Sequence, residues 1–250
     1  DCCTASGPRM TARIPSLIYA TGRDGIYVNQ FVASMAQVIM DGGTTVALTL
    51  ETAYPSDSEI VLEVEPERPV EFTLYVRLPA WCRNPSLRVK GKNVKGLQPG
   101  NYASLERTWK KGDRVELTLP MQPRWVEGSH TTEGMWALTR GPVVYAVDTV
   151  LWDEQTRQAL GKVPRDLSQT IGWAFDESSP SAGFEEASTP DEALGPLYRA
   201  PVVFPNGKRA EVRAWPFANV GTWYADPTSK PDHNERWYAF AVWLRRAERE

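Results

Sequence analysis

The regular alternation of apolar and polar residues in short segments is the feature that most limits how this chain can fold. In residues 72–78 every second position is apolar, which is the pattern of a strand with one buried face. Turn-forming groups such as Asp41-Gly42-Gly43 and Lys111-Gly112-Asp113 separate segments of this kind. The expected strands are 26–32, 38–40, 45–52, 59–64, 70–78, 87–90, 102–109 and 114–119. Short strands at this spacing predict an antiparallel β-sandwich or barrel.

A second unit is expected beyond residues 120–132, where the alternation lapses. A long apolar run at 135–147 opens this unit, and 210–215 and 237–244 are expected to close it as strands. Between them, residues 153–196 are polar and rich in Ser, Pro, Glu and Asp. We interpret residues 153–196 as a long surface excursion with little regular structure.

A single helix is expected before the first strand. Apolar residues recur at helical spacing at Met10, Ile14 and Leu17, and Ser6 resembles an N-cap. Pro15 is expected to kink this helix, and Gly22 to end it. An apolar helix without a helical neighbour in sequence should belong to a larger helical domain. The chain begins without a signal peptide, so we interpret it as a processed or truncated piece of a longer polypeptide.

Charge and composition exclude several function classes. A net charge of −3 over 250 residues argues against binding to nucleic acid or to a membrane surface. No apolar stretch is long enough to span a bilayer. Three cysteines give no disulfide framework, which favours a reducing compartment such as the cytoplasm. Ten tryptophans are many for this length, and they fit either stacking on sugar rings or packing in the core.

The adjacent cysteines Cys2 and Cys3 carry the strongest chemical signal. A disulfide between sequence neighbours is strained, whereas two thiolates can share one metal ion and one of them can act as a nucleophile. Zinc needs four ligands, and the other candidates, Cys82, His130 and His233, are far apart in sequence. We interpret Cys82 as a buried apolar residue and both histidines as solvated, so further ligands are expected outside this chain.

Acidic residues do not single out a catalytic pair. The pairs Asp153-Glu154 and Glu185-Glu186 lie in the polar stretch and are best interpreted as solvated surface. The sequence contains no nucleophile elbow, phosphate-binding loop or HExxH motif.

An ordered series of stretches covers roughly residues 1–148. It comprises Cys2-Cys3 with Arg9, Asp24-Gly25-Ile26-Tyr27-Val28-Asn29, Glu51-Thr52-Ala53-Tyr54-Pro55, Arg77-Leu78-Pro79-Ala80-Trp81-Cys82, Tyr102, Arg107-Thr108-Trp109, Lys111-Gly112-Asp113, Leu119-Pro120-Met121 and residues 137–145. In this order they resemble the zinc-dependent cysteine glycosidases typified by β-L-arabinofuranosidase, glycoside hydrolase family 127. Ala5-Ser6-Gly7 departs from the family's usual pattern, which often has Asn there, and leaves the sugar open.

The resemblance implies an (α/α)6 barrel followed by two β-sandwich units. Residues 1–20 would be the last barrel helix, 21–123 the first sandwich and 124–250 the second. The expected fold class is therefore mainly β, with two tandem antiparallel sandwiches after one helix of a barrel that otherwise lies outside the chain.

The resemblance also implies the chemistry of a retaining glycoside hydrolase. Cys2 would be the nucleophile and a zinc ligand, and Cys3 a second zinc ligand. A further cysteine, a ligand glutamate and the acid/base glutamate would come from the rest of the barrel, so this segment alone should be inactive. The expected partners are a carbohydrate substrate, the barrel and, as an open possibility, a second copy of the chain. The alternative is a non-catalytic β-sandwich module for carbohydrate binding or dimerisation.

Overall fold

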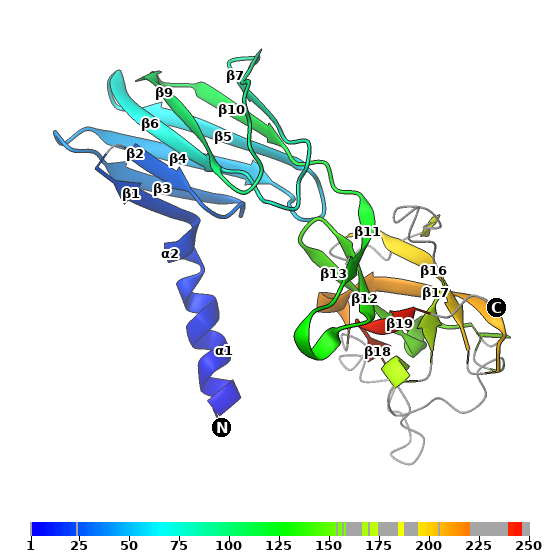
Figure 1. The fold of residues 1–250 in the computed structure, drawn as a ribbon. Helices are drawn as coiled ribbons and strands as arrows, with labels where there is room; N and C mark the ends of the chain where they lie inside the picture. The colour runs from blue at the N-terminus through cyan, green and yellow to red at the C-terminus, as the bar shows by residue number, and fades with distance from the viewer. Residues whose placement is uncertain are drawn as a thin grey trace. The chain divides into compact units, whose positions relative to one another are not determined.

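A computed structural model describes residues 2–23, 25–153, 155, 156, 158, 167–169, 171–174, 185–187, 195–204, 206–220 and 240–246 (Figure 1). The chain divides into two compact units, Asp1–Met121 and Gln122–Glu250. Both are built mainly from strands, and one long helix precedes the first, so the expected fold class is confirmed. Within the described residues, no helix is long and apolar enough to cross a lipid bilayer.

The helical segment differs from the prediction at both ends. Helix α1 spans Cys2–Arg13, so Ser6 lies inside it and is not its N-cap. Helix α2 spans Pro15–Ile18, and its first residue is the proline expected to interrupt the helix, because proline lacks the N–H of a continuing helix. The chain then enters a strand, β1 (Tyr19–Gly22), instead of staying helical to Gly22.

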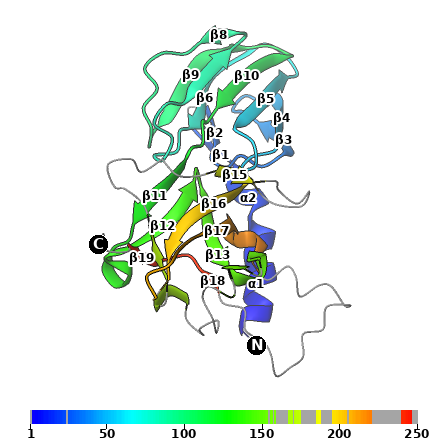
Figure 2. The same ribbon diagram turned by 90° about the vertical axis from the view of Figure 1, so that its right-hand side faces the viewer.

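The first unit is a sandwich of two sheets, which Figure 2 shows as two layers. One sheet has the order β1-β2-β6-β9 and the other the order β3-β4-β5-β10-β7-β8. Their strands are β2 (Gly25–Val28), β3 (Ser34–Ile39), β4 (Thr45–Thr52), β5 (Glu59–Pro66), β6 (Val70–Arg77), β7 (Ser86–Val89), β8 (Lys92–Asn93), β9 (Tyr102–Trp109) and β10 (Asp113–Thr118). The strands predicted at 45–52 and 102–109 have the expected bounds.

One pairing in this unit departs from the antiparallel expectation, because β2 runs parallel to β6. The two backbones approach closely at Gly25, where a Cβ atom would lie 1.8 Å from the carbonyl oxygen of Thr73. Only glycine fits such a contact. Gly25 therefore allows the strand that follows the helices to join the sheet.

The core between the two sheets holds one buried carboxylate. Asp113 is 2% exposed, and its Oδ1 lies 2.5 Å from Lys90 Nζ. Its Oδ2 accepts a hydrogen bond from the backbone N–H of Lys110 at 3.2 Å. Beside it, the indole N–H of the fully buried Trp109 donates to the carbonyl oxygen of Phe72 at 3.0 Å. The buried polar groups of Asp113 and Trp109 therefore have partners.

The described strands of the second unit join in a single nine-stranded sheet. They are β11 (Pro123–Glu127), β12 (Met135–Arg140), β13 (Val143–Asp148), β14 (Gly172–Trp173), β15 (Glu185–Ala187), β16 (Leu197–Val203), β17 (Arg209–Pro216), β18 (Phe240–Ala241) and β19 (Leu244–Arg246). The order is β11-β12-β19-β14-β16-β17-β13-β18, with β15 beside β16. Because β12 also pairs with β13, the path from β12 to β13 closes on itself. The pairing of β14 with β19 is parallel, a second departure from the antiparallel expectation.

The interpretation of residues 153–196 as a surface excursion is wrong for its middle part. Leu167, Ile171 and Trp173 are at most 3% exposed and belong to the core of the second unit. The indole N–H of Trp173 donates to the carbonyl oxygen of Trp136 at 2.9 Å. The polar composition of the surrounding residues concealed these isolated core positions. Most of the remainder of this stretch lies outside the described residues.

Candidate functional site

The cysteine pair opens helix α1 at its first two residues. The side chains of Cys2 and Cys3 lie outside the described part of the structure, so their roles stay predictions. From Cys2 to Ile18 the two helices rise about 24 Å at 1.5 Å per residue. The cysteine pair therefore lies at the opposite end of the helical segment from β1, the strand that follows the helices.

The other predicted ligands do not meet at a metal site. Cys82 is 1% exposed in the core of the first unit, where burial raises the pKa of its thiol. This confirms its interpretation as a buried apolar residue. His130 is exposed, as expected, whereas His233 lies outside the described residues. No group of three or more His, Cys, Asp or Glu side chains that could hold a metal is found in the described ranges. Two adjacent thiols supply only two of the four donors that zinc requires, and the described residues do not complete the set.

The acidic pairs give little support for catalysis. Asp153 is exposed, and its Oδ1 accepts a hydrogen bond from the backbone N–H of Thr156 at 2.7 Å. Glu154 lies outside the described residues. Glu185 and Glu186 form part of β15, and their side chains are not described.

Residues from separate stretches of the motif series converge around Arg77 in the first unit. Its Nε donates a hydrogen bond to the carbonyl oxygen of Asn29. Its guanidinium also lies 5.5 Å from the centre of the Phe31 ring, a cation–π contact. Phe31 in turn makes an edge contact with Tyr54 at 5.7 Å. Tyr102 completes the group, because its hydroxyl donates to Asn29 Oδ1 at 2.6 Å. We call these five residues the Arg77 cluster.

The Arg77 cluster is connected to the helical segment through Asn29. The backbone N–H of Asn29 donates to the carbonyl oxygen of Ile18, the last residue of α2, at 2.8 Å. Tyr19 follows Ile18, and its hydroxyl lies 3.2 Å from Ser34 Oγ. Burial raises the pKa of the Tyr19 hydroxyl. These contacts fix the point at which the cysteine-bearing helices enter the sandwich. The sequence showed these residues only as separate motifs, because their convergence depends on the pairing of β2, β6 and β9.

Most described tryptophans pack inside the units. Five of them are at most 5% exposed: Trp109, Trp125, Trp152, Trp173 and Trp215. Trp81, Trp136 and Trp243 are half-buried, so none of the tryptophans in the described ranges is fully exposed. The tryptophan excess therefore fits packing in the core better than a sugar-stacking platform.

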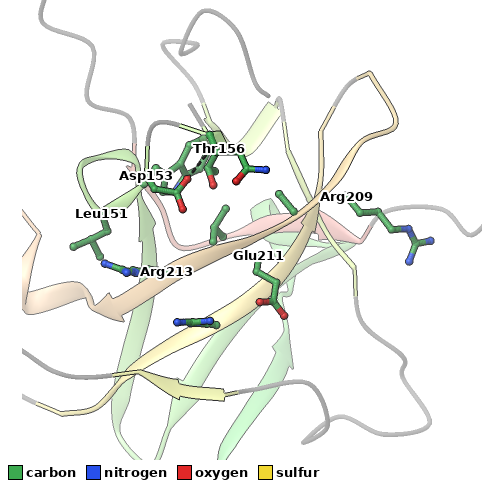
Figure 3. Close-up of a pocket in the computed structure, with 11 residues that line it drawn as sticks. Leu151, Asp153, Thr156, Arg209, Glu211 and Arg213 are labelled. Atoms are coloured by element: carbon green, nitrogen blue, oxygen red, sulfur yellow. Dashed lines mark hydrogen bonds between the residues drawn. The ribbon is translucent and has the colours of Figure 1, made fainter. Parts of the chain in front are cut away.

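A polar pocket of about 380 Å³ lies in the second unit (Figure 3). Arg209, Glu211 and Arg213 follow one another along β17, with Asp153 and Thr156 facing that strand in Figure 3. The remaining lining residues are Leu151, Trp152, Gln155, Arg199, Ala210 and Val212. Sequence reasoning missed this site. The alternation of Arg209, Glu211 and Arg213 was a visible signal, but Arg199 is placed only by the register of β16 against β17.

The fold defines a β-sandwich protein in which two tandem β units follow a helix that begins with two cysteines. Residues 25–121 match the family model described as "Beta-L-arabinofuranosidase, GH127 middle domain". This range contains nearly all of the first unit's sheets and the whole Arg77 cluster. The resemblance to this family is thus confirmed for the first β unit.

Solved structures extend the likeness in fold to both units. Ara127N-Se, a GH127 β-L-arabinofuranosidase from Geobacillus stearothermophilus T6, is 26% identical with a TM-score of 0.74, over 98% of this chain and 37% of that protein. A protein described as a glycoside hydrolase is 22% identical with a TM-score of 0.75, over 99% and 40%. A GH127 β-arabinofuranosidase is 22% identical with a TM-score of 0.71, over 98% and 38%. The chain therefore spans well under half of each of these proteins. No curated protein sequence matches it.

Proposed function

We propose that this chain is part of a retaining glycoside hydrolase of the β-L-arabinofuranosidase type and supplies its nucleophile, Cys2. The observation that carries the proposal is the match of residues 25–121 to the GH127 middle domain. The helices that start with Cys2-Cys3 end at Ile18, and β1 connects them to this matched range.

In the proposed reaction the Cys2 thiolate attacks the anomeric carbon of an arabinofuranoside. The new carbon–sulfur bond forms as the glycosidic carbon–oxygen bond breaks, and an acid outside this chain protonates the leaving oxygen. Water, deprotonated by the same group, then displaces the thiolate from that carbon. Two displacements at one carbon retain its configuration.

Zinc belongs to this proposal with Cys2 and Cys3 as two of its ligands. The other ligands and the acid/base residue would lie outside these 250 residues. When bound, zinc would keep the thiol of Cys2 deprotonated near neutral pH. The proposed partners are thus a carbohydrate substrate and an (α/α)6 barrel of the longer polypeptide, and the chain alone should not turn over substrate.

The Arg77 cluster has a positioning role in this proposal. It fixes Asn29, whose backbone N–H donates a hydrogen bond to the carbonyl oxygen of Ile18 at the end of α2. A displaced α2 would carry the cysteines at the far end of α1 with it. Arg77 and Asn29 would therefore affect the reaction through the helix, without touching the substrate.

The test is hydrolysis of 4-nitrophenyl β-L-arabinofuranoside by the full-length protein and its variants. Cys2→Ser should reduce kcat by about a thousandfold or more, because the hydroxyl is a far weaker nucleophile than the thiolate. Cys82→Ser is the matched control, since Cys82 is buried in the first unit and should affect stability alone. Full activity in Cys2→Ser, or no hydrolysis of any arabinofuranoside by the unaltered protein, would overturn the proposal.

A further inference from the structure

The polar pocket of the second unit is a candidate binding site, and Cys2 is not among its lining residues. It is lined by three arginines, Arg199, Arg209 and Arg213, and by two acids, Asp153 and Glu211. A volume of about 380 Å³ falls in the range of small-molecule sites. The pocket therefore has room for one or two sugar rings, and its lining carries a net positive charge.

The arginines of this pocket are unusual in their placement. Arg199 on β16 stands directly opposite Arg213 on β17. Like charges in directly opposed positions of an antiparallel pair destabilise it. Among the described residues, none of the three arginines makes an ion pair, and all three are exposed. An anion placed between Arg199 and Arg213 would remove this repulsion.

Trp152 forms part of the wall of the same pocket. It is 4% exposed and lines the pocket, and its ring packs against Phe204. Its Nε1 is buried and has no hydrogen-bond partner in the described structure. The Trp152 ring therefore forms part of the pocket wall, while its Nε1 lies too deep for a ligand in the pocket to contact.

The two acidic residues of the pocket, Asp153 and Glu211, limit which kind of anion can bind there. Carboxylates at Asp153 and Glu211 accept hydrogen bonds and repel a second negative charge. They disfavour a doubly charged phosphate and favour a ligand that also carries hydroxyl donors. Gln155 and Thr156 add side chains that can both donate and accept. One negative charge combined with several hydroxyls is the chemistry of a sugar carboxylate.

We propose that this pocket binds an acidic saccharide, a sugar residue bearing one carboxylate. Arg199 and Arg213 hold the carboxylate, since guanidinium groups pair with it in a planar, two-bond geometry. Glu211 and Asp153 accept hydrogen bonds from the sugar hydroxyls.

The test is calorimetric titration of the 250-residue chain with D-galacturonic acid, D-galactose and inorganic phosphate in turn. Galacturonate should bind, and galactose and phosphate should each bind at least about tenfold more weakly, the difference expected for one charge-assisted contact. Arg199→Gln and Arg213→Gln should each weaken galacturonate binding by a similar factor. Arg245→Gln is the control, an exposed arginine on β19 of the same unit.

Several results would overturn the proposal. Absence of galacturonate binding would reject the site. Phosphate binding as tight as galacturonate binding would reject the saccharide and leave a general anion site. Equal binding of galactose, or an equal effect of Arg245→Gln, would reject the role of the arginine pair. Because none of these titrations measures hydrolysis, failure here is distinguishable from failure of the proposed glycosidase activity.

Discussion

Arg77 in the first β unit and the pair Arg199 and Arg213 in the second differ in their partners. In the first, the buried Asp113 is paired with Lys90, and Arg77 is held by Asn29 and Phe31. In the second, Arg199 and Arg213 face each other across two strands, and the described structure gives neither an ion pair. Charges that have partners hold a fold together, whereas charges without them are available to a ligand. The difference supports the binding site proposed at Arg199 and Arg213.

The largest loss of stability is expected at Gly25, where the strand that follows the helices joins its sheet. Gly25→Ala places a Cβ atom 1.8 Å from the backbone oxygen of Thr73, so β2 must separate from β6. We expect a loss of about 3 kcal/mol or more in the free energy of unfolding, typical of severe overpacking. Urea denaturation measures it. Gly112→Ala is the control, because nothing lies near its Cβ position and only its positive φ of 79° opposes the change, at about 1 kcal/mol. Equal losses in both variants would contradict this account of β2.

The same substitution should act differently in the two units. Arg77→Gln removes a hydrogen bond and a cation–π contact and should destabilise the chain by about 2 kcal/mol. Arg213→Gln removes a repulsion, so the stability should stay within about 0.5 kcal/mol of the unaltered chain or rise slightly. Thermal unfolding of the two variants side by side tests the comparison. A similar loss in both would show that the arginines of the second unit also have a structural role.

A smaller difference is expected between two ion pairs of the first unit. Asp113→Asn disrupts a buried pair whose partner Lys90 is 45% exposed, so we expect a loss of about 1–2 kcal/mol, with solvent screening included. Glu116→Gln breaks an exposed contact of 3.6 Å with Arg114 and should cost less than about 0.5 kcal/mol. Chemical denaturation at low salt measures both. A larger loss for Glu116→Gln would invalidate the ranking by burial.

The smallest predicted effect is a change in how stability declines at alkaline pH. Burial raises the pKa of the Tyr54 hydroxyl above 10.0, and the positive charge of Arg77 partly offsets this. The folded state therefore holds this proton more tightly than the unfolded state. Its contribution to stability is complete below about pH 10 and is lost as the pH rises through the folded-state pKa. Tyr54→Phe should flatten the decline in stability above about pH 10, although the raised pKa of Cys82 leaves some decline from about pH 9. An unchanged alkaline slope would contradict the burial of the Tyr54 hydroxyl.

The fold was predictable where sequence pattern and burial coincide. Residues 45–52 and 102–109 alternate cleanly because one face of each strand packs on the core of the first unit. Trp173 was missed because a strand of two residues, Gly172–Trp173, is too short to show a period. The start of α1 was also missed, since Ser6 is a residue type typical of an N-cap although helical residues precede it.

The candidate sites were predictable to a lesser extent. Cys2 and Cys3 are adjacent in sequence, so their pairing was visible without a structure. The Arg77 cluster and the polar pocket depend on strand register, which joins Arg77 to Tyr102 and Arg199 to Arg213. Register is set by packing across the whole sheet, and no local signal in a single sequence gives it.

The central claim is that Cys2 carries the chemistry of the longer protein, and a covalent intermediate tests it most directly. The full-length protein would be mixed with an activated β-L-arabinofuranoside, quenched in acid within milliseconds, digested and analysed by peptide mass spectrometry. The account predicts a pentose adduct on the peptide that contains Cys2, absent from Cys2→Ser and present in Cys82→Ser. Turnover without any adduct on Cys2, or an adduct on another residue that persists in Cys2→Ser, would contradict it.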